Sequence, residues 1–292
     1  MKLLRFRQGD LVRLGVMDGD DIVPLDMIQD RYPTMLSVIA GGEAALADVR
    51  SAASQCDERI SLSSVHLLAP IERPGKFLAI GMNYRKHAEE AKKLGIKVPE
   101  QQFWFNKQTS CITGPYDDIN PGVTEKLDYE VELGVVIGKP AKGVSEADAH
   151  NHVFGYLVSN DVSARDWQQH SPTFTIGKSF DTHGPIGPWI VTADEIENPH
   201  ALGIRCFING EVRQQSDTSE LIHNIWAQIA YLSTAFTLES GDLLATGTPE
   251  GVGVARNPPV FMKPGDIVRC EIDKIGAIEN TVIESATSVA TE

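Results

Sequence analysis

Two acidic side chains stand two positions apart in the segment LDYEVELGVV, residues 127 to 136. Along a β-strand, this spacing would place Glu130 and Glu132 on one face and their apolar neighbours on the other. If that face is buried, two like charges a few ångströms apart are costly, and a divalent cation between them removes the repulsion. The alternative is a strand that presents both carboxylates to solvent.

A third oxygen donor, Asp161, follows the apolar run from Val153 to Val158 and is expected near the end of a strand. Carboxylates without Cys or His form a hard ligand set, which favours Mg²⁺, or Mn²⁺ and less often Ca²⁺, over Zn²⁺. Three protein ligands leave about three octahedral positions open for water and substrate. The three carboxylates therefore predict an open, catalytic magnesium site.

His87 and Glu90 lie three residues apart in a charged segment. If residues 84 to 94 are helical, both side chains lie on the same side and the carboxylate can orient the imidazole. Such a pair can take a proton from water. The alternative is an exposed helix in which this spacing arises by chance.

Two further segments place polar residues beside glycine. Lys178 follows Gly177 in a region punctuated by Pro and Gly, where a lone lysine is commonly solvated. The segment TGTPEGVG, residues 246 to 253, leaves an expected strand. It lacks the patterns of a P-loop and of a Rossmann turn, so it does not support nucleotide binding, although its backbone can approach a small ligand closely.

The elements that must position these residues form two units. Residues 1 to 70 alternate short apolar runs with turns and then enter an Ala-rich stretch, which Gly41 and Gly42 divide into two helices. This pattern predicts a small N-terminal α+β domain. A stretch containing Pro and Gly follows, so we expect the catalytic domain over residues 71 to 292.

The second unit is dominated by strand-like runs, at residues 76–80, 103–105, 129–137, 152–159, 186–191, 204–208, 243–246 and 267–272. One amphipathic helix is expected from Thr218 to Leu238. Its core-facing residues would be Leu221, Ile225, Ile229, Leu232 and Phe236. Residues 81 to 98 are rich in charge and predict a solvent-facing helix or a mobile lid. The predicted fold class is α+β, mostly β.

Composition limits the possible partners. The chain of 292 residues carries 40 acidic and 26 basic side chains, a net charge of −14, without a Lys/Arg cluster that could follow a phosphate backbone, so we expect no nucleic-acid partner. The chain start has no apolar stretch, and no run of about 18 apolar residues occurs, so neither export nor membrane insertion is predicted. Four scattered cysteines fit reduced thiols and a cytoplasmic location.

Five motifs follow one another along the chain: GMNYRKHAEE at 81–90, DYEVE at 128–132, NDVSARDWQ at 160–168, GKSFD at 177–181 and TGTPEGVG at 246–253. With them the chain resembles the fumarylacetoacetate hydrolase family over about residues 75 to 285, and residues 1 to 70 resemble the N-terminal extension of bacterial members. The resemblance implies a mixed β-roll core behind the small N-terminal α+β domain, and usually a homodimer.

The resemblance also implies site roles. It maps Mg²⁺, with Mn²⁺ as an alternative, onto Glu130, Glu132 and Asp161. It maps the water-activating pair onto His87 and Glu90, and substrate contacts onto Arg165, Gln168, Lys178 and Thr248, with Lys178 also a catalytic residue that holds developing negative charge. Some members carry Arg where this chain has Met82, so Arg85 is the alternative for carboxylate recognition there.

The activity that the resemblance implies is metal-dependent hydrolysis of the C3–C4 bond of a 2,4-dioxo acid. The metal would polarise the C2 carbonyl, and His87, held by Glu90, would activate the water that attacks C4. The substrate class is acylpyruvate-like, and the chain is similar to hydrolases that convert 2,4-diketo-3-deoxy-L-rhamnonate to pyruvate and lactate. The alternative is a lyase that decarboxylates oxaloacetate or an aromatic-degradation intermediate. A non-catalytic metal-binding module is a distant third, because it does not explain the His–Glu pair, Lys178 and Thr248 together.

Overall fold

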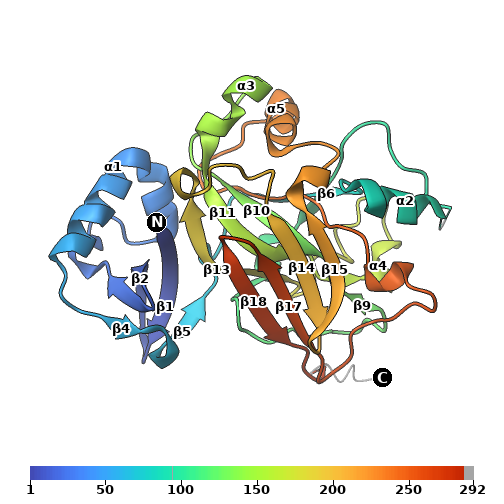
Figure 1. The fold of residues 1–292 in the computed structure, drawn as a ribbon, viewed down its shortest axis with the longest axis horizontal. Helices are drawn as coiled ribbons and strands as arrows, with labels where there is room; N and C mark the ends of the chain where they lie inside the picture. Colours follow the sequence, from blue (N-terminus) through green and yellow to red (C-terminus); the bar gives the residue numbers. More distant parts are fainter. Residues whose placement is uncertain (94, 286–292) are drawn as a thin grey trace, which may run out of the picture.

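One mixed sheet crosses the computed structural model, which describes residues 1–93 and 95–285 (Figure 1). Its strand order is β4-β3-β2-β1-β13-β11-β10-β16-β6-β7, with β5 beside β1 and β8 beside β13. The strands are β1 (Lys2–Gln8), β2 (Leu11–Asp18), β3 (Asp21–Pro24), β4 (Ile60–Ser61), β5 (His66–Leu68), β6 (Phe77–Gly81), β7 (Phe103–Lys107), β8 (Ile112–Thr113), β10 (Val131–Ile137), β11 (Val153–Asn160), β13 (Gly184–Thr192) and β16 (Leu243–Ala245).

A second sheet lies in front of β10 and β11 in the view of Figure 1. Its order is β15 (Glu211–Asp217), β14 (Gly203–Ile208), β17 (Ile267–Ile272) and β18 (Gly276–Thr281). Alternate residues of β14 and β17 are buried, and Ile204 and Val268 join a core with Leu133 and Val158 from the first sheet. The other side of β10 and β11 belongs to a separate core, so these two strands are buried on both faces.

Helices pack around the two sheets, and the longest one joins the second core beside β10 and β11. They are α1 (Met35–Gln55), α2 (Arg85–Lys93), α3 (Glu146–Ala149), α4 (Arg165–Gln168) and α5 (Ile225–Ala235), and the short strands β9 (Leu127–Asp128) and β12 (Ser163–Ala164) pair separately. The predicted class, α+β and mostly β, is confirmed. Within the described ranges, no helix has both the length and the apolar character needed to cross a membrane.

The N-terminal strands are continuous with the rest of the sheet. Strand β1 pairs with β13 at Lys2↔Val191 and Leu3↔Ile190. Thr34 caps α1, and Gly42 interrupts it with φ 55°, which confirms the predicted division into two helices. The boundary between residues 70 and 71 stays a prediction.

The predicted helix over residues 218 to 238 is too long. Asn224 ends the preceding loop by capping α5, its side chain accepting a hydrogen bond from the Ala227 backbone N–H at 2.9 Å. Four of the five predicted core residues are buried, but Phe236 follows the helix in an extended conformation and is 37% exposed, so its assignment to the core is wrong.

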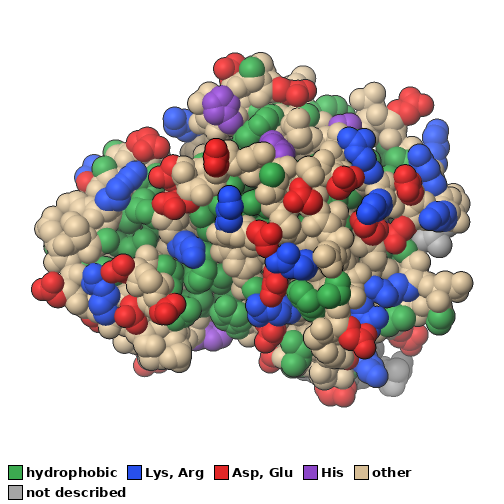
Figure 2. All heavy atoms as spheres, viewed as in Figure 1, with side chains coloured by type: hydrophobic (Ala, Val, Ile, Leu, Met, Phe, Trp, Pro, Cys, Tyr) green, Lys and Arg blue, Asp and Glu red, His purple; other side chains and the backbone are tan. Residues whose placement is uncertain are grey.

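Charged side chains of both signs share the face of the molecule shown in Figure 2. Lys and Arg residues are interspersed with Asp and Glu over the elements on this face, and no extended basic surface forms there. Ion pairs such as those that Arg205 and Arg269 make with Glu271 agree with this mixing of charges.

We expect Gly155→Ala to destabilise the protein by about 2 kcal/mol or more, because a Cβ at this position of β11 would overlap the carbonyl oxygen of Val191 on β13. Denaturant unfolding measures this change. Gly19→Ala is the control: its turn has φ 62° but open space around the position, so it should cost only about 1 kcal/mol. Equal costs for both variants would contradict the tight contact between β11 and β13.

Candidate active site

The ends of two antiparallel strands bring the predicted carboxylates together. Glu132 lies on β10, and Glu130 is the residue just before this strand begins. Asp161 is the residue just after β11 ends, and Asn160 of β11 pairs with Val131 of β10. Oxygens of Glu130, Glu132 and Asp161 lie within 4.8 Å of one another. All three side chains are buried, and the Asp161 backbone N–H donates to the Glu130 carbonyl at 2.8 Å. The solvated-strand alternative is therefore wrong.

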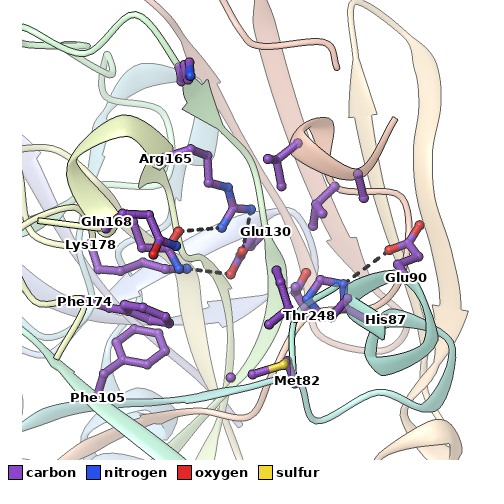
Figure 3. A pocket seen from close by; sticks show the side chains of 18 of the residues that line it. Met82, His87, Glu90, Phe105, Glu130, Arg165, Gln168, Phe174, Lys178 and Thr248 are labelled. Atoms are coloured by element: carbon purple, nitrogen blue, oxygen red, sulfur yellow. Dashed lines mark hydrogen bonds and ion pairs between the residues drawn. The ribbon is translucent and has the colours of Figure 1, made fainter. Parts of the chain in front are cut away.

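Cationic side chains contact Glu130 and Asp161, and Figure 3 shows Arg165 and Lys178 beside Glu130. Lys178 Nζ lies 2.7 Å from both Glu130 Oε2 and Asp161 Oδ2. Arg165 Nη2 lies 2.6 Å from Glu130 Oε1, and Lys107 Nζ lies 2.6 Å from Asp161 Oδ1. Lys178 is thus a buried bridge between two carboxylates and not the solvated lysine that its glycine-rich surroundings allowed.

Asp128 fixes Arg165 and the glycine-rich loop. It accepts from Arg165 Nε at 2.8 Å and from the backbone N–H groups of Gly253 and Val254 at 2.7 and 2.9 Å. The other end of the guanidinium donates to Gln168 Oε1 at 3.0 Å, which turns the Gln168 amide nitrogen away from Arg165. Arg165 and Gln168 are therefore held together at one side of the carboxylate cluster.

Glu132 is the carboxylate without a cationic contact in the described part of the chain. It accepts from the Gly247 backbone N–H at 2.8 Å. Burial, together with the charges of Asp161 and Glu130, raises the pKa of Glu132 well above its usual value. Burial also acts to raise the pKa of Glu130, but Lys178 and Arg165 outweigh it and lower that pKa to about 2.

A divalent cation fits this cluster. Its three ligands would be carboxylate oxygens, which suit Mg²⁺ or Mn²⁺. The neighbouring carboxylates favour a proton on Glu132, and a bound cation would displace that proton. Elsewhere in residues 1–93 and 95–285, no other group of three or more Asp, Glu, His or Cys side chains comes this close. The acidic triad can therefore bind a metal ion.

The predicted His–Glu pair lies on α2, on the opposite side of the cavity from Lys178 in Figure 3. His87 Nδ1 lies 3.3 Å from Glu90 Oε2. Both Glu90 oxygens also accept from the Gly251 backbone N–H, at 3.0 and 3.2 Å. The glycine-rich loop therefore holds Glu90, and Glu90 in turn orients the imidazole toward the cavity.

A cavity of about 580 Å³ joins these groups, and every predicted site residue except the deeper Asp161 lines it. Thr248 donates its hydroxyl proton to the Val131 carbonyl at 3.0 Å and accepts from Gln214 at 2.8 Å. Its backbone N–H makes no hydrogen bond within the described part of the chain and remains available to a ligand.

The structure gives site roles to groups for which the sequence analysis predicted none, some of them inside the motifs. Asp128 and Lys107 support the carboxylates, and the cavity wall is apolar at Ile80, Met82, Ile96, Phe105, Phe174, Val252, Val254, Pro259 and Phe261. Arg85, the predicted alternative for carboxylate recognition, is exposed and does not line the cavity. Lys107 ends the largely apolar segment FWFNK, residues 103 to 107, and this position in the sequence could have indicated a buried lysine.

Comparisons with known proteins agree with this geometry. Residues 76–283 match the family described as Fumarylacetoacetate (FAA) hydrolase C-terminal, and residues 1–70 match the one described as Rv2993c-like, N-terminal. The chain belongs to the fumarylacetoacetate hydrolase family. The family resemblance of the five motifs is thereby confirmed, and the protein is an enzyme of this family.

Three relatives illustrate the range of this family. "Oxaloacetate tautomerase fahd2, mitochondrial" of Xenopus laevis is 44% identical over 97% of this chain and 90% of its own. The fumarylacetoacetate hydrolase from Exiguobacterium antarcticum has a TM-score of 0.85 at 35% identity, covering 97% and 99% of the two chains. Maleylpyruvate hydrolase from Sphingobium sp. SYK-6, solved with manganese(II) and pyruvate, has a TM-score of 0.82 at 32% identity, covering 97% and 99%.

These family relatives leave several predictions open. Their printed names include a tautomerase and hydrolases, so the reaction class is not fixed by family membership. The identity of the ion, the homodimer, the cytoplasmic location and the 2,4-diketo-3-deoxy-L-rhamnonate substrate stay predictions.

We expect Glu132→Gln to abolish the stabilisation that Mn²⁺ gives the wild-type protein, about 2.7 kcal/mol at a hundredfold excess over Kd. The metal-free variant should be as stable as wild type or about 1 kcal/mol more stable, because an uncharged amide replaces a carboxylate whose charged form burial and the neighbouring carboxylates disfavour. Thermal unfolding with EDTA and with Mn²⁺ measures both effects. Glu211→Gln, at an exposed position, is the control. Full Mn²⁺ stabilisation of Glu132→Gln would exclude Glu132 as a ligand.

Proposed function

We propose that this family member is a divalent-cation-dependent enzyme that interconverts the keto and enol forms of oxaloacetate or a closely similar 2-oxo acid. The proposal rests on His87, which Glu90 orients and which can accept a proton in the same cavity as the buried carboxylate cluster. The 44% identity with the Xenopus laevis oxaloacetate tautomerase, over nearly the whole chain, supports the same reaction.

The charge of the site suits an anionic substrate. Four buried carboxylates lie beside three cations, of which two are buried and Arg165 is partly buried; the carboxylates are Asp128, Glu130, Glu132 and Asp161, and the cations are Lys107, Arg165 and Lys178. With all four carboxylates ionised the sum is one negative charge, and a bound divalent cation would make it one positive charge. A substrate with one or two carboxylates then enters a field of opposite sign.

The residues of the chain would position the substrate and move its proton. A divalent cation held by the three carboxylates supplies Lewis-acid polarisation of a carbonyl oxygen. Lys178 has one ammonium hydrogen left after its two carboxylate contacts, and the Gln168 amide and the Thr248 backbone N–H are further donors for a substrate carboxylate.

His87 would take a proton from C3 of the keto form while Glu90 stabilises the resulting imidazolium. The electron pair of the C3–H bond moves into the C2–C3 bond, and the imidazolium returns its proton to the C2 oxygen. The product is the enol, with no atom gained or lost.

Hydrolysis of an acylpyruvate-like 2,4-dioxo acid is the second candidate. A cavity of about 580 Å³ with an extended apolar wall exceeds what oxaloacetate requires, and it would accept a longer acyl tail. The likeness to the maleylpyruvate hydrolase solved with pyruvate supports it. In this reaction His87 would take a proton from water, the water oxygen would attack C4, and the C3–C4 bond would break as C3 gains a proton.

Parallel assays of the Mn²⁺-loaded enzyme separate the candidates. Decay of the enol absorbance of oxaloacetate reports tautomerisation, pyruvate release from oxaloacetate reports decarboxylation, and pyruvate release from acylpyruvates reports hydrolysis. We expect the tautomerisation to have the highest kcat/KM. Pyruvate release from an acylpyruvate at a higher kcat/KM would replace the first candidate by the second, and inactivity of the loaded enzyme on all substrates would reject both.

We expect His87→Ala to lower kcat for oxaloacetate tautomerisation by about 10²- to 10⁴-fold, because it removes the proton acceptor. Oxalate, which needs no proton transfer, should bind the Mn²⁺-loaded variant nearly as in wild type. Stopped-flow absorbance and calorimetry give the two values. His150→Ala, on a histidine outside the cavity, is the matched control. An unchanged kcat in His87→Ala would remove this residue from the mechanism.

We expect Phe174→Ala to lower kcat/KM for an acylpyruvate with a long apolar tail by about tenfold relative to oxaloacetate, because it removes part of the apolar wall. Phe174 packs edge-on against Phe103 and Phe105, with centroids 5.2 and 6.1 Å away. Phe236→Ala, at the exposed end of α5, is the control. Equal losses on both substrates would show that the wall does not select the tail.

A further inference from the structure

Lys107, at the end of β7, is a buried cation that the proposed reaction does not use. Its side chain is fully buried and does not line the cavity. The ammonium donates to Asp161 Oδ1 at 2.6 Å, to the His183 carbonyl at 3.0 Å and to the Lys178 carbonyl. Its three hydrogens thus have three acceptors, so none remains for a substrate. Lys107 can therefore affect the substrate only through its neighbours.

The hydrogen bond to Asp161 places this charge against the carboxylate cluster. Asp161 contacts Lys107 through one oxygen and Lys178 through the other, and it lies within 4.8 Å of both remaining carboxylates. All these groups are buried, so solvent screens the charge of Lys107 only weakly. Its three acceptors, one of them a buried carboxylate, match the three hydrogens of a charged ammonium group.

We infer that Lys107 is a positioning residue that sets the net charge of the site, weakening the binding of the divalent cation while strengthening the binding of the anionic substrate that follows. With Lys107, the cation-loaded cluster carries one positive charge. Without Lys107, the same cluster would be neutral, and a cation would meet less repulsion while an anion would lose attraction. Loss of the Lys107 charge should therefore raise the affinity for the cation and lower the affinity for the anion.

The inference rests on the cation site of the proposed function but not on its reaction. A purely structural lysine would behave differently, since the loss of its three hydrogen bonds would loosen Asp161 and the Lys178 segment together. Such loosening would weaken both cation and anion binding. Opposite changes therefore separate a charge-setting role from a structural one.

The experiment compares wild type, Lys107→Met and Lys76→Met. Free Mn²⁺ is measured by electron paramagnetic resonance during titration, and oxalate binding at saturating Mn²⁺ is measured by calorimetry. For Lys107→Met we expect Mn²⁺ to bind about threefold tighter or more, and oxalate about tenfold weaker or more. Lys76→Met is the matched control because it breaks the ion pair of 2.7 Å with buried Asp242, away from the cavity, and should leave both constants unchanged.

Two further variants keep the test decisive. Lys107→Arg retains the charge and should shift both constants back toward wild type. If circular dichroism shows that Lys107→Met is unfolded, Lys107→Gln removes the charge while retaining hydrogen-bond donors, and the same opposite shifts are expected. Mn²⁺ binding that is unchanged or weaker, or oxalate binding that is unchanged, would overturn the inference. Failure of wild type to bind Mn²⁺ would instead reject the cation site itself.

Discussion

Repulsion among three buried carboxylates, with oxygens within 4.8 Å of one another, is the interaction to which the rest of the site responds. Lys178 and Arg165 stabilise the charge of Glu130, and Lys107 and Lys178 stabilise that of Asp161. Glu132 keeps only a backbone donor, and its raised pKa marks the place where positive charge is still needed. The cluster can thus bind a divalent cation, and in the proposed function this cation would attract an anionic substrate.

The loop that contacts the carboxylate cluster also supports His87, the proton acceptor of the proposed function. The loop after β16 donates from Gly247 to Glu132 and from Gly251 to Glu90, so one glycine-rich segment holds a proposed metal ligand and the partner of His87. Its glycines have φ 106° and 99°, values that other residues rarely adopt. This shared support explains how α2, whose exposed side is strongly charged, keeps the imidazole over the cavity.

Strand alternation placed Glu130 and Glu132 on one face, and helical spacing placed His87 beside Glu90, but the spacing alone left a solvent-exposed alternative for each. The family resemblance of the five motifs favoured the site roles, and the approach of Asp161 depends on the pairing of β10 with β11. The break in α1 could be predicted from Gly41 and Gly42. Long-range packing decided what the sequence did not show: Lys107 becomes a partner of Asp161 only when β7 meets the segment carrying His183. Strands β15 and β18, at the edges of the second sheet, were not predicted because their sequences contain no apolar run. Few of their residues are buried, so these strands do not need one.

Diffraction from crystals soaked with Mn²⁺ and oxalate, with data collected at the manganese absorption edge, shows whether the three carboxylates hold one cation. We expect one strong anomalous peak at about 2.0–2.3 Å from oxygens of Glu130, Glu132 and Asp161, with oxalate completing the coordination on the cavity side. An anomalous map without a peak between these three carboxylates, or with the ion held elsewhere in the cavity, would contradict it.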